Sequence, residues 1–162
     1  MKLEQVTNVV FVGLGGQGII RSSDILVDVL FHAGLDVKKA EIHGMSQRGG
    51  AVTSDVRFGR QVLSPMVPRG EADFIVALDR DLARRAIPLL GPEGTMIKPD
   101  DIDLARLPSK KCLNIALLGR LSDCLPFPPE AWDAAIRRAF PERHHEMNCH
   151  AFRIGCTARQ VA

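Results

Sequence analysis

The sequence predicts a three-layer α/β/α, Rossmann-like domain with a mixed, mostly parallel sheet. Two observations favour this class: short apolar, β-favouring runs precede segments with helical spacing, and glycine-rich turns stand between them. The 162 residues are 46% hydrophobic and 25% charged, which is typical of one domain with a buried core. The sequence contains no internal repeat, low-complexity tract or long linker. We therefore expect a single domain over residues 1–162.

The N-terminal half begins as a strand–turn–helix unit and then departs from strict alternation. Residues 9–12 predict a strand and residues 19–33 a helix, with glycines between them. A second strand is predicted over residues 37–42. Residues 51–58 alternate between apolar and polar side chains, as expected for a strand with one wet face. Residues 61–64 are predicted to return beside this strand as a hairpin, which makes the sheet mixed.

The C-terminal half repeats the strand-to-helix order once and ends in helices. Residues 74–78 are five consecutive apolar residues and predict a buried strand. The segments predicted after it are a helix (81–90), a closing glycine turn (91–94), a short strand (95–98) and a polar connector (99–108). Three helices complete the chain, and they are predicted at residues 114–125, from the proline pair at 128–129 onward, and from residue 144 to about 158.

Charge and hydropathy exclude two classes of partner. The formal net charge is +2 and no run of Lys or Arg concentrates it, so we expect neither nucleic acid nor a membrane as a partner. The first residues are charged, and the apolar run that follows is far shorter than a signal-peptide core or a span of about 20 residues. A cytoplasmic location is the expectation.

Cysteine and histidine spacing favours packing over metal binding. The four cysteines form no Cys-x-x-Cys pair, which argues against a zinc ribbon or an iron–sulfur site built from this chain alone. Cys149 and Cys156 lie one heptad apart in a predicted helix, and a packing role is expected for them. Neighbouring helical positions point about 100° apart. His144, His145 and Glu146 are therefore interpreted as exposed helix surface, and no metal site is predicted.

Two glycine-rich turns carry the strongest functional signal. The first runs from Gly13 to Gly18 and the second from His43 to Gly50, and each follows a predicted strand. Glycine allows successive N–H groups to point inward at the positive end of a helix, where a phosphate or carboxylate fits. Arg48 adds a bidentate donor beside hydroxyl and amide groups. The residues predicted to bind a cofactor are Gly13, Gly15, Gly16, Gln17, Gly18, Ser46, Gln47 and Arg48.

Other interpretations of these turns stay open. Gly13, Gly15 and Gly18 satisfy G-x-G-x-x-G, and Glu41 is a candidate for holding the ribose of NAD. Alternatively, the glycines only permit a tight strand-to-helix crossing. A nucleotide triphosphatase loop is excluded, because no Lys-Ser or Lys-Thr follows Gly18. No catalytic group stands out together with its partner. His43 and Arg48 are the catalytic candidates, and a structural hydrogen bond is an equal alternative for His43.

The order of motifs resembles the gamma subunit or gamma domain family of the 2-oxoacid:ferredoxin oxidoreductases, with indolepyruvate ferredoxin oxidoreductase as the nearest branch. The most specific segment is His-Gly-Met-Ser-Gln-Arg-Gly-Gly at residues 43–50. The other matching segments are residues 12–19, 54–59 (Ser-Asp-Val-Arg-Phe-Gly), 64–65 (Ser-Pro) and 70–73 (Gly-Glu-Ala-Asp), together with Asn148, Ala151, Phe152 and Gly155.

The resemblance implies a multisubunit enzyme that oxidatively decarboxylates a 2-oxoacid with thiamine diphosphate, passes electrons through iron–sulfur clusters to ferredoxin and transfers the acyl group to coenzyme A. It assigns the thiamine diphosphate and the clusters to a larger partner subunit, and no cofactor is expected on this chain alone. It places this type of domain at the subunit interface, near the coenzyme A path.

The sequence thus favours a non-thiamine subunit whose glycine turns complete a shared active site and meet the phosphates of coenzyme A. The isolated chain is expected to be inactive. One alternative is a stand-alone NAD-binding Rossmann protein. A second is a purely structural interaction subunit whose glycine turns pack against the partner's backbone.

Overall fold

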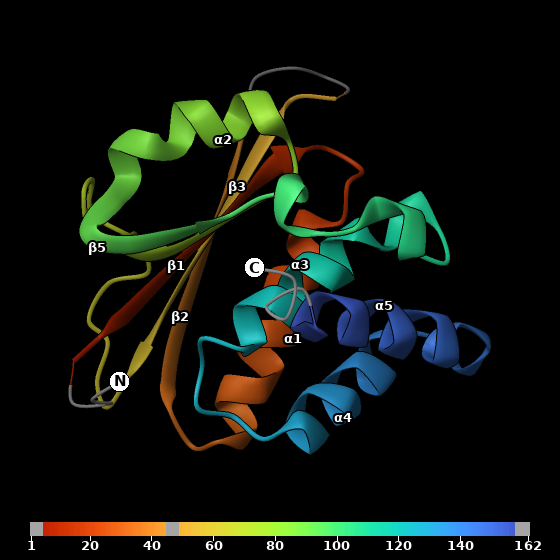
Figure 1. Ribbon diagram of the computed structural model, residues 1–162. Coiled ribbons are helices and arrows are strands. Elements are labelled where there is room, and N and C mark those ends of the chain that lie inside the picture. The colour runs from red at the N-terminus through yellow and green to blue at the C-terminus, as the bar shows by residue number, and fades with distance from the viewer. Residues whose placement is uncertain (1–4, 45–48, 158–162) are drawn as a thin grey trace.

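The computed structural model describes residues 5–44 and 49–157 of the chain, and these form a sheet covered by helices (Figure 1). The strands are β1 (Thr7–Leu14), β2 (Asp36–His43), β3 (Ala51–Gly59), β4 (Ala72–Ala77) and β5 (Leu90–Ile97). The α-helices are α1 (Ile19–His32), α2 (Arg80–Ala86), α3 (Leu113–Ser122), α4 (Pro129–Ala139) and α5 (His145–Thr157).

The sheet has the strand order β2-β3-β1-β4-β5. β1 pairs in parallel with β4, and β4 with β5, whereas β3 is antiparallel to both β1 and β2. Among the described strands, β3 is therefore antiparallel to the other four. The α/β class and the mixed, mostly parallel sheet are confirmed.

Helices cover both faces of the sheet (Figure 1). α2 packs on one face against a small core that includes Val10, Ile75 and Ala83. The other face carries the larger core, to which α1, α3, α4 and α5 contribute. This core includes Phe11 from β1 and Trp132 from α4, both almost fully buried. The apolar residues of β1 alternate between the two cores, as the two-residue period of a strand requires.

The predictions for four segments, 61–64, 81–90, 91–94 and 95–98, are wrong in type or in bounds. Residues 61–64 form no strand, because β3 is already paired by β2 on one edge and by β1 on the other. The helix predicted to reach residue 90 ends at Ala86, and a 3₁₀ turn over Ile87–Leu89 contains Pro88, which cannot continue the hydrogen-bond ladder. β5 then begins at Leu90 rather than at residue 95, so residues 91–94, which were predicted to be a closing turn, lie within this strand.

A network of polar side chains fixes the loop over residues 60–70. Arg57 donates from Nη1 to the carbonyl oxygens of Ser64 and Met66, each at 3.1 Å, and from Nε to Oδ1 of Asn8 at 2.8 Å. The N–H of Val67 donates to Oδ2 of Asp55 at 2.9 Å. This set of contacts, here called the loop clamp, joins β3 to the loop and to Asn8 at the start of β1. The clamp gives the Asp55 carboxylate, which is only 4% exposed, a hydrogen-bond donor inside the protein.

The Asp55 carboxyl makes the clamp sensitive to pH. Burial raises its pKa, against the lowering effects of the Val67 N–H and the Arg57 charge. A carboxyl whose pKa is raised on folding binds protons more readily in the folded state, so its contribution becomes less favourable as the pH rises through that pKa. As the pH falls from 7 to 4, the unfolding free energy of wild type should therefore rise relative to that of Asp55→Asn. Urea titrations at several pH values measure this difference, and a shift in the opposite direction contradicts the assignment.

Helices α3 and α5 cross in direct backbone contact. A Cβ atom at Gly155 would overlap the carbonyl oxygen of Ala116, and one at Gly119 would overlap that of Phe152. Glycine at both positions allows the two helix axes to approach closely. The C-terminal residues that match the resemblance, Ala151, Phe152 and Gly155, thus lie in a packing interface between helices.

The four cysteines are free thiols, and two of the C-terminal histidines are partly buried. All four thiols are free, and burial raises the pKa of Cys112, of Cys156 and, to about 11, of Cys149. His144 and His145 are half-buried, so their interpretation as exposed surface is wrong. The His145 ring donates from Nε2 to the carbonyl oxygen of Phe140 at 2.7 Å and closes the turn before α5.

Candidate functional site

The two glycine-rich turns meet at the end of the sheet where β1 finishes and β3 begins. Leu14 and Ala51 are register partners, which places the first turn beside the last residues of the second. The Gly15 N–H donates to the carbonyl oxygen of Gly50 at 2.9 Å, and the Gly44 N–H donates to that of Ala51 at 2.8 Å. The first turn is thereby held by the second through main-chain hydrogen bonds.

Three residues of the first turn have structural tasks. A Cβ at Gly13 would overlap the Ile19 side chain, so glycine there allows α1 to pack against β1. Gln17 accepts the Leu14 N–H at Oε1, at 2.7 Å. Gly18 has φ +88°, and its carbonyl accepts from Nδ2 of Asn114 at 3.3 Å. The tight-crossing interpretation explains these positions, and their predicted role in binding stays a prediction.

Gly16 differs from its neighbours because its surroundings are open. Its φ is +91°, and no described atom lies within 4 Å of the place that a Cβ would take. It lines two cavities, which lie on either side of the turn. The backbone at Gly16 is therefore open to approach by another molecule, and its predicted role in binding a cofactor stays a prediction.

The first cavity, of about 460 Å³, lies where β1 and β4 end side by side. After β1 the chain continues to α1 on one face of the sheet, and after β4 to α2 on the other. A crevice at such a switch point is the usual ligand site of an open α/β sheet. The residues lining the cavity are Gly16, Gln17, Leu78, Lys110, Lys111 and Leu113.

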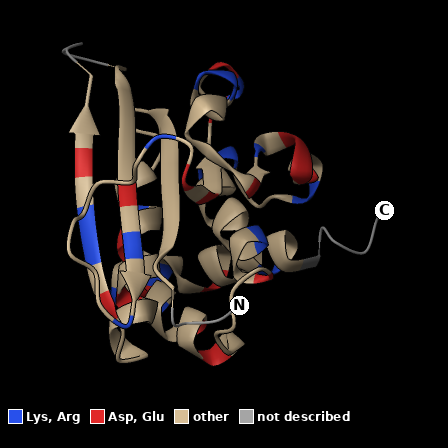
Figure 2. Cartoon of the chain, turned by 90° about the vertical axis from the view of Figure 1, so that its left-hand side faces the viewer, with Lys and Arg blue, Asp and Glu red and all other residues tan. Residues whose placement is uncertain are grey.

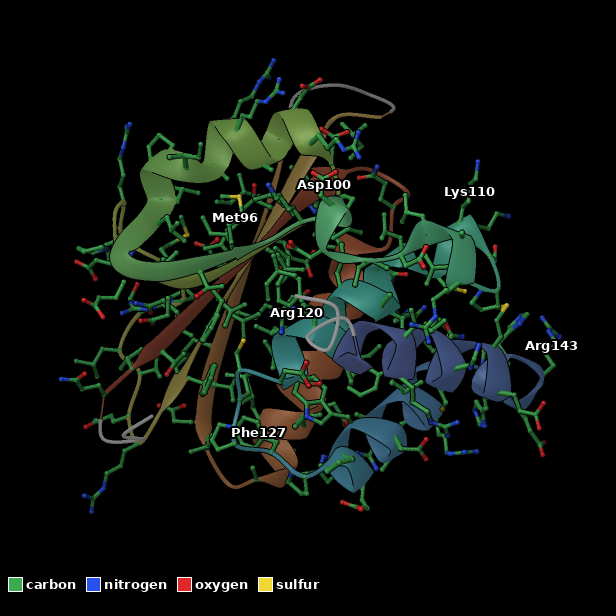
Figure 3. The ribbon with its side chains drawn as sticks, in the orientation of Figure 1. Met96, Asp100, Lys110, Arg120, Phe127 and Arg143 are labelled. Carbon is green, nitrogen blue, oxygen red and sulfur yellow. The ribbon has the colours of Figure 1, made fainter. Side chains whose placement is uncertain are left out.

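Lys110 and Lys111 are additions that the sequence analysis missed. They lie in a 3₁₀ turn, Lys110–Cys112, directly before α3, and both are exposed at the mouth of the cavity. Figure 3 shows Lys110 extending outward at this end of the molecule. The available signal was two adjacent lysines after Ser109, whose hydroxyl accepts the Lys111 N–H at 3.3 Å. Ammonium groups and exposed backbone N–H groups are the donors that anions such as phosphate accept from.

The second cavity, of about 430 Å³, follows the N-terminal turn of α1. It is lined by Gly15, Gly16, Gly18 and the side chains of Arg21 and Asp24, among others. The first N–H groups of α1 have no acceptor within the helix, and they carry the positive end of its dipole. Gly16 lines both cavities.

Glu41 and His43 lie apart from the first turn. β3 separates β2 from β1 in the sheet, and Glu41 is therefore two strands away from β1. Its carboxylate accepts from Nζ of Lys39 at 2.6 Å, which lowers its pKa, and its second oxygen lies 3.5 Å from Nε2 of His43. An acidic residue that holds a ribose follows the strand beside β1. This arrangement speaks against the NAD alternative.

Comparison with known proteins decides the family. The family model described as pyruvate ferredoxin/flavodoxin oxidoreductase matches residues 8–108. The chain belongs to this family. A similar curated protein, "Indolepyruvate oxidoreductase subunit IorB" of Thermococcus kodakarensis, is 32% identical over 93% of this chain and 95% of its own length. The resemblance inferred from the motifs is confirmed.

Solved structures share the fold of this pyruvate ferredoxin/flavodoxin oxidoreductase family member. The gamma subunit of a keto/oxoacid ferredoxin oxidoreductase from Geobacter sulfurreducens has a TM-score of 0.74 at 22% identity, covering 96% of this chain and 99% of its own. A 2-oxoglutarate:ferredoxin oxidoreductase from Magnetococcus marinus has a TM-score of 0.83 at 17% identity, covering 98% of this chain and 32% of its own. The whole described fold thus equals about a third of that longer chain.

The family motifs of the N-terminal half separate into two groups in space, apart from the C-terminal matches in the α3–α5 interface. Those around Gly13–Gly18 lie at the cavities, whereas Asp55, Arg57 and residues 70–73 belong to the network around the loop clamp. Ser46, Gln47 and Arg48, which were predicted to bind a cofactor, lie outside the described residues, so their roles stay predictions. The described residues contain no group of three or more His, Cys, Asp or Glu side chains arranged to hold a metal ion. None of the described helices is long and apolar enough to cross a membrane.

Proposed function

We propose that this chain is the non-thiamine subunit of a 2-oxoacid:ferredoxin oxidoreductase and forms one wall of its coenzyme A path. Family membership supports the enzyme class, and the name of the Thermococcus relative favours indolepyruvate as the 2-oxoacid. A larger partner subunit carries the thiamine diphosphate and the iron–sulfur clusters, and ferredoxin is reached through the complex. The isolated chain is expected to be inactive.

The cavity between Gly16 and the Lys110–Lys111 pair is the observation that carries the proposal for coenzyme A. Coenzyme A bears a pyrophosphate and a ribose phosphate, and both need cationic or N–H donors. The exposed ammonium groups supply charge, the open backbone at Gly16 permits close approach, and the α1 N-terminus adds its dipole. The residues present therefore fit the nucleotide part of this ligand.

The division of work between subunits follows from that geometry. Coenzyme A supplies the thiol that accepts the acyl group. Lys110, Lys111 and the first glycine turn would hold its phosphates, so that the thiol end extends toward the partner subunit. Gln17 supports this wall indirectly, because its hydrogen bond to Leu14 shapes the turn that presents Gly16.

Removal of both lysines tests the proposal. In the assembled enzyme, Lys110→Ala with Lys111→Ala should raise the KM for coenzyme A about tenfold or more, because each charge-assisted contact to a phosphate contributes on the order of 1 kcal/mol. The kcat at saturating coenzyme A and the KM for the 2-oxoacid should stay within about twofold of wild type, since the lysines hold the nucleotide and not the reacting atoms. Steady-state kinetics with each substrate varied separately measures both constants.

Arg84→Ala is the matched control. Arg84 also carries a positive charge at an exposed helical position, but it lies on α2 and pairs with Asp81 rather than lining either cavity. Its removal should leave the KM for coenzyme A unchanged. An unchanged KM in the double lysine variant would leave this subunit with a structural role only.

A further inference from the structure

The loop over residues 60–70 is held rigidly although it contains no helix or strand. Besides the loop clamp of Asp55 and Arg57, the Val62 N–H donates to Oδ2 of Asp36 at 2.7 Å. The Val62 side chain is 2% exposed and is the buried apolar side chain of the loop. The loop follows β3 and crosses the sheet face that carries α2 and the small core, here called the outer face, which is turned to the viewer in Figure 2.

This fixed loop presents apolar side chains to solvent. Leu63 is 88% exposed, the largest value for a large apolar side chain in the described part of the chain, and Met66 is 48% exposed. The fold has no need of either side chain, because the anchors to Ser64, Met66 and Val67 are made through main-chain atoms. A rigid backbone with exposed Leu and Met loses little conformational entropy when those side chains become buried in a partner.

The charges of the loop indicate the chemistry of the partner. Arg60 and Arg69 stand at its two ends, both exposed, and residues 60–70 contain no acidic side chain. A complementary surface has an apolar pocket for Leu63 and Met66 with carboxylates at its rim. A protein surface provides such a pocket with fixed walls.

We infer that the loop is a docking element, here called the docking loop (residues 60–70), which inserts Leu63 and Met66 into an acid-rimmed apolar pocket of the larger partner subunit. The identity of the partner rests on the proposed function. The Magnetococcus chain supports it, because the same fold there forms about a third of a longer chain. The docking loop lies on the outer sheet face, whereas the cavities lie at the strand ends around Gly16, so docking and coenzyme A binding are separate tasks.

Association of the full chain with the large subunit of the same enzyme tests the inference. Leu63→Asp should raise the Kd of association at least about tenfold, because a carboxylate replaces an apolar anchor in a pocket rimmed by like charges. Leu63 is exposed, so the thermal midpoint of the isolated variant should equal that of wild type. Leu104→Asp is the matched control: its side chain is 47% exposed, it lies in the turn Leu104–Arg106 outside the docking loop, and it should leave the Kd within about twofold.

A second variant tests whether Arg60 and Arg69 interact with carboxylates at the rim of the partner's pocket. Arg60→Glu with Arg69→Glu should lower the association rate and reduce its dependence on salt, since steering by opposite charges acts on the encounter. Interferometry at two or more ionic strengths measures both quantities. A Kd for Leu63→Asp within twofold of wild type overturns the inference.

Two further results would also overturn it by assigning the loop another occupant. One is a wild-type chain that is dimeric in sedimentation, becomes monomeric on Leu63→Asp and binds the large subunit unchanged. The other is Leu63-dependent cosedimentation with phosphatidylglycerol vesicles without any effect on subunit association. The proposed function is tested separately, because its failure appears as an unchanged coenzyme A KM in a complex that assembles normally.

Discussion

Replacement of Gly155 by alanine should destabilise the protein by about 3 kcal/mol or more, near the upper end of what overpacking costs. The new Cβ would overlap the carbonyl oxygen of Ala116 on α3, which is backbone and cannot rotate away. Either α5 moves outward and opens the core around Phe152, or the helices strain. The midpoint of urea denaturation measures the loss, with the slope checked for two-state unfolding.

Two companion variants separate this packing effect from helix propensity. Gly119→Ala places its Cβ against the carbonyl oxygen of Phe152 from the opposite helix and should be similarly harmful. His150→Ala lies on α5 at an exposed position and should change stability by less than about 0.5 kcal/mol. Alanine is the better helix former, so a stabilised Gly155→Ala protein would show that the two helices are not in contact as described.

Replacement of Arg57 by alanine should cost about 3 kcal/mol and release the docking loop. The guanidinium satisfies Asn8 Oδ1 and the carbonyl oxygens of Ser64 and Met66, and its charge lies near the buried Asp55 carboxyl. Its removal leaves acceptors without their donor and a carboxylate without its nearby cation. Denaturant titration should show the loss of stability, and limited proteolysis should show new cleavage within residues 60–70.

The variant Arg57→Lys separates the effect of the positive charge from the effect of the hydrogen-bond geometry of the guanidinium. Arg57→Lys keeps a positive charge near Asp55 but cannot reproduce contacts from both Nε and Nη1. It should recover part of the stability while the loop still becomes susceptible to protease. If Arg57→Ala resists protease as wild type does, the backbone of the loop is held by other means.

Prediction from sequence worked where the signal was local. The strand and helix of the first unit, the buried strand β4 and the helical C-terminal half were predicted because period and capping residues lie within contiguous segments. The family was also predicted from local motifs. Prediction failed at residues 61–64, because β3 has no free edge left for another strand. It also failed at the end of α2, because Pro88 ends the helix.

The candidate site was predicted only in half. The first glycine turn carries its own signature, but Lys110 and Lys111 lie between the predicted connector (99–108) and the predicted helix (114–125), where the sequence predicted no element. The distinction among the glycines was also invisible in sequence. Contacts with Ile19 and Asn114 leave no room for a side chain at Gly13 and Gly18, whereas Gly16 faces open space.

The amino-acid sequence by itself determined the alternation of strands, turns and helices and the membership of the family, because both depend on neighbouring residues. Only the tertiary structure decided that β3 separates β2 from β1, that Lys110 and Lys111 face Gly16, and that Arg57 fixes the docking loop. These arrangements join residues far apart in the chain. They depend on which strand edges and crevices remain free after the core has packed, and no local pattern encodes that.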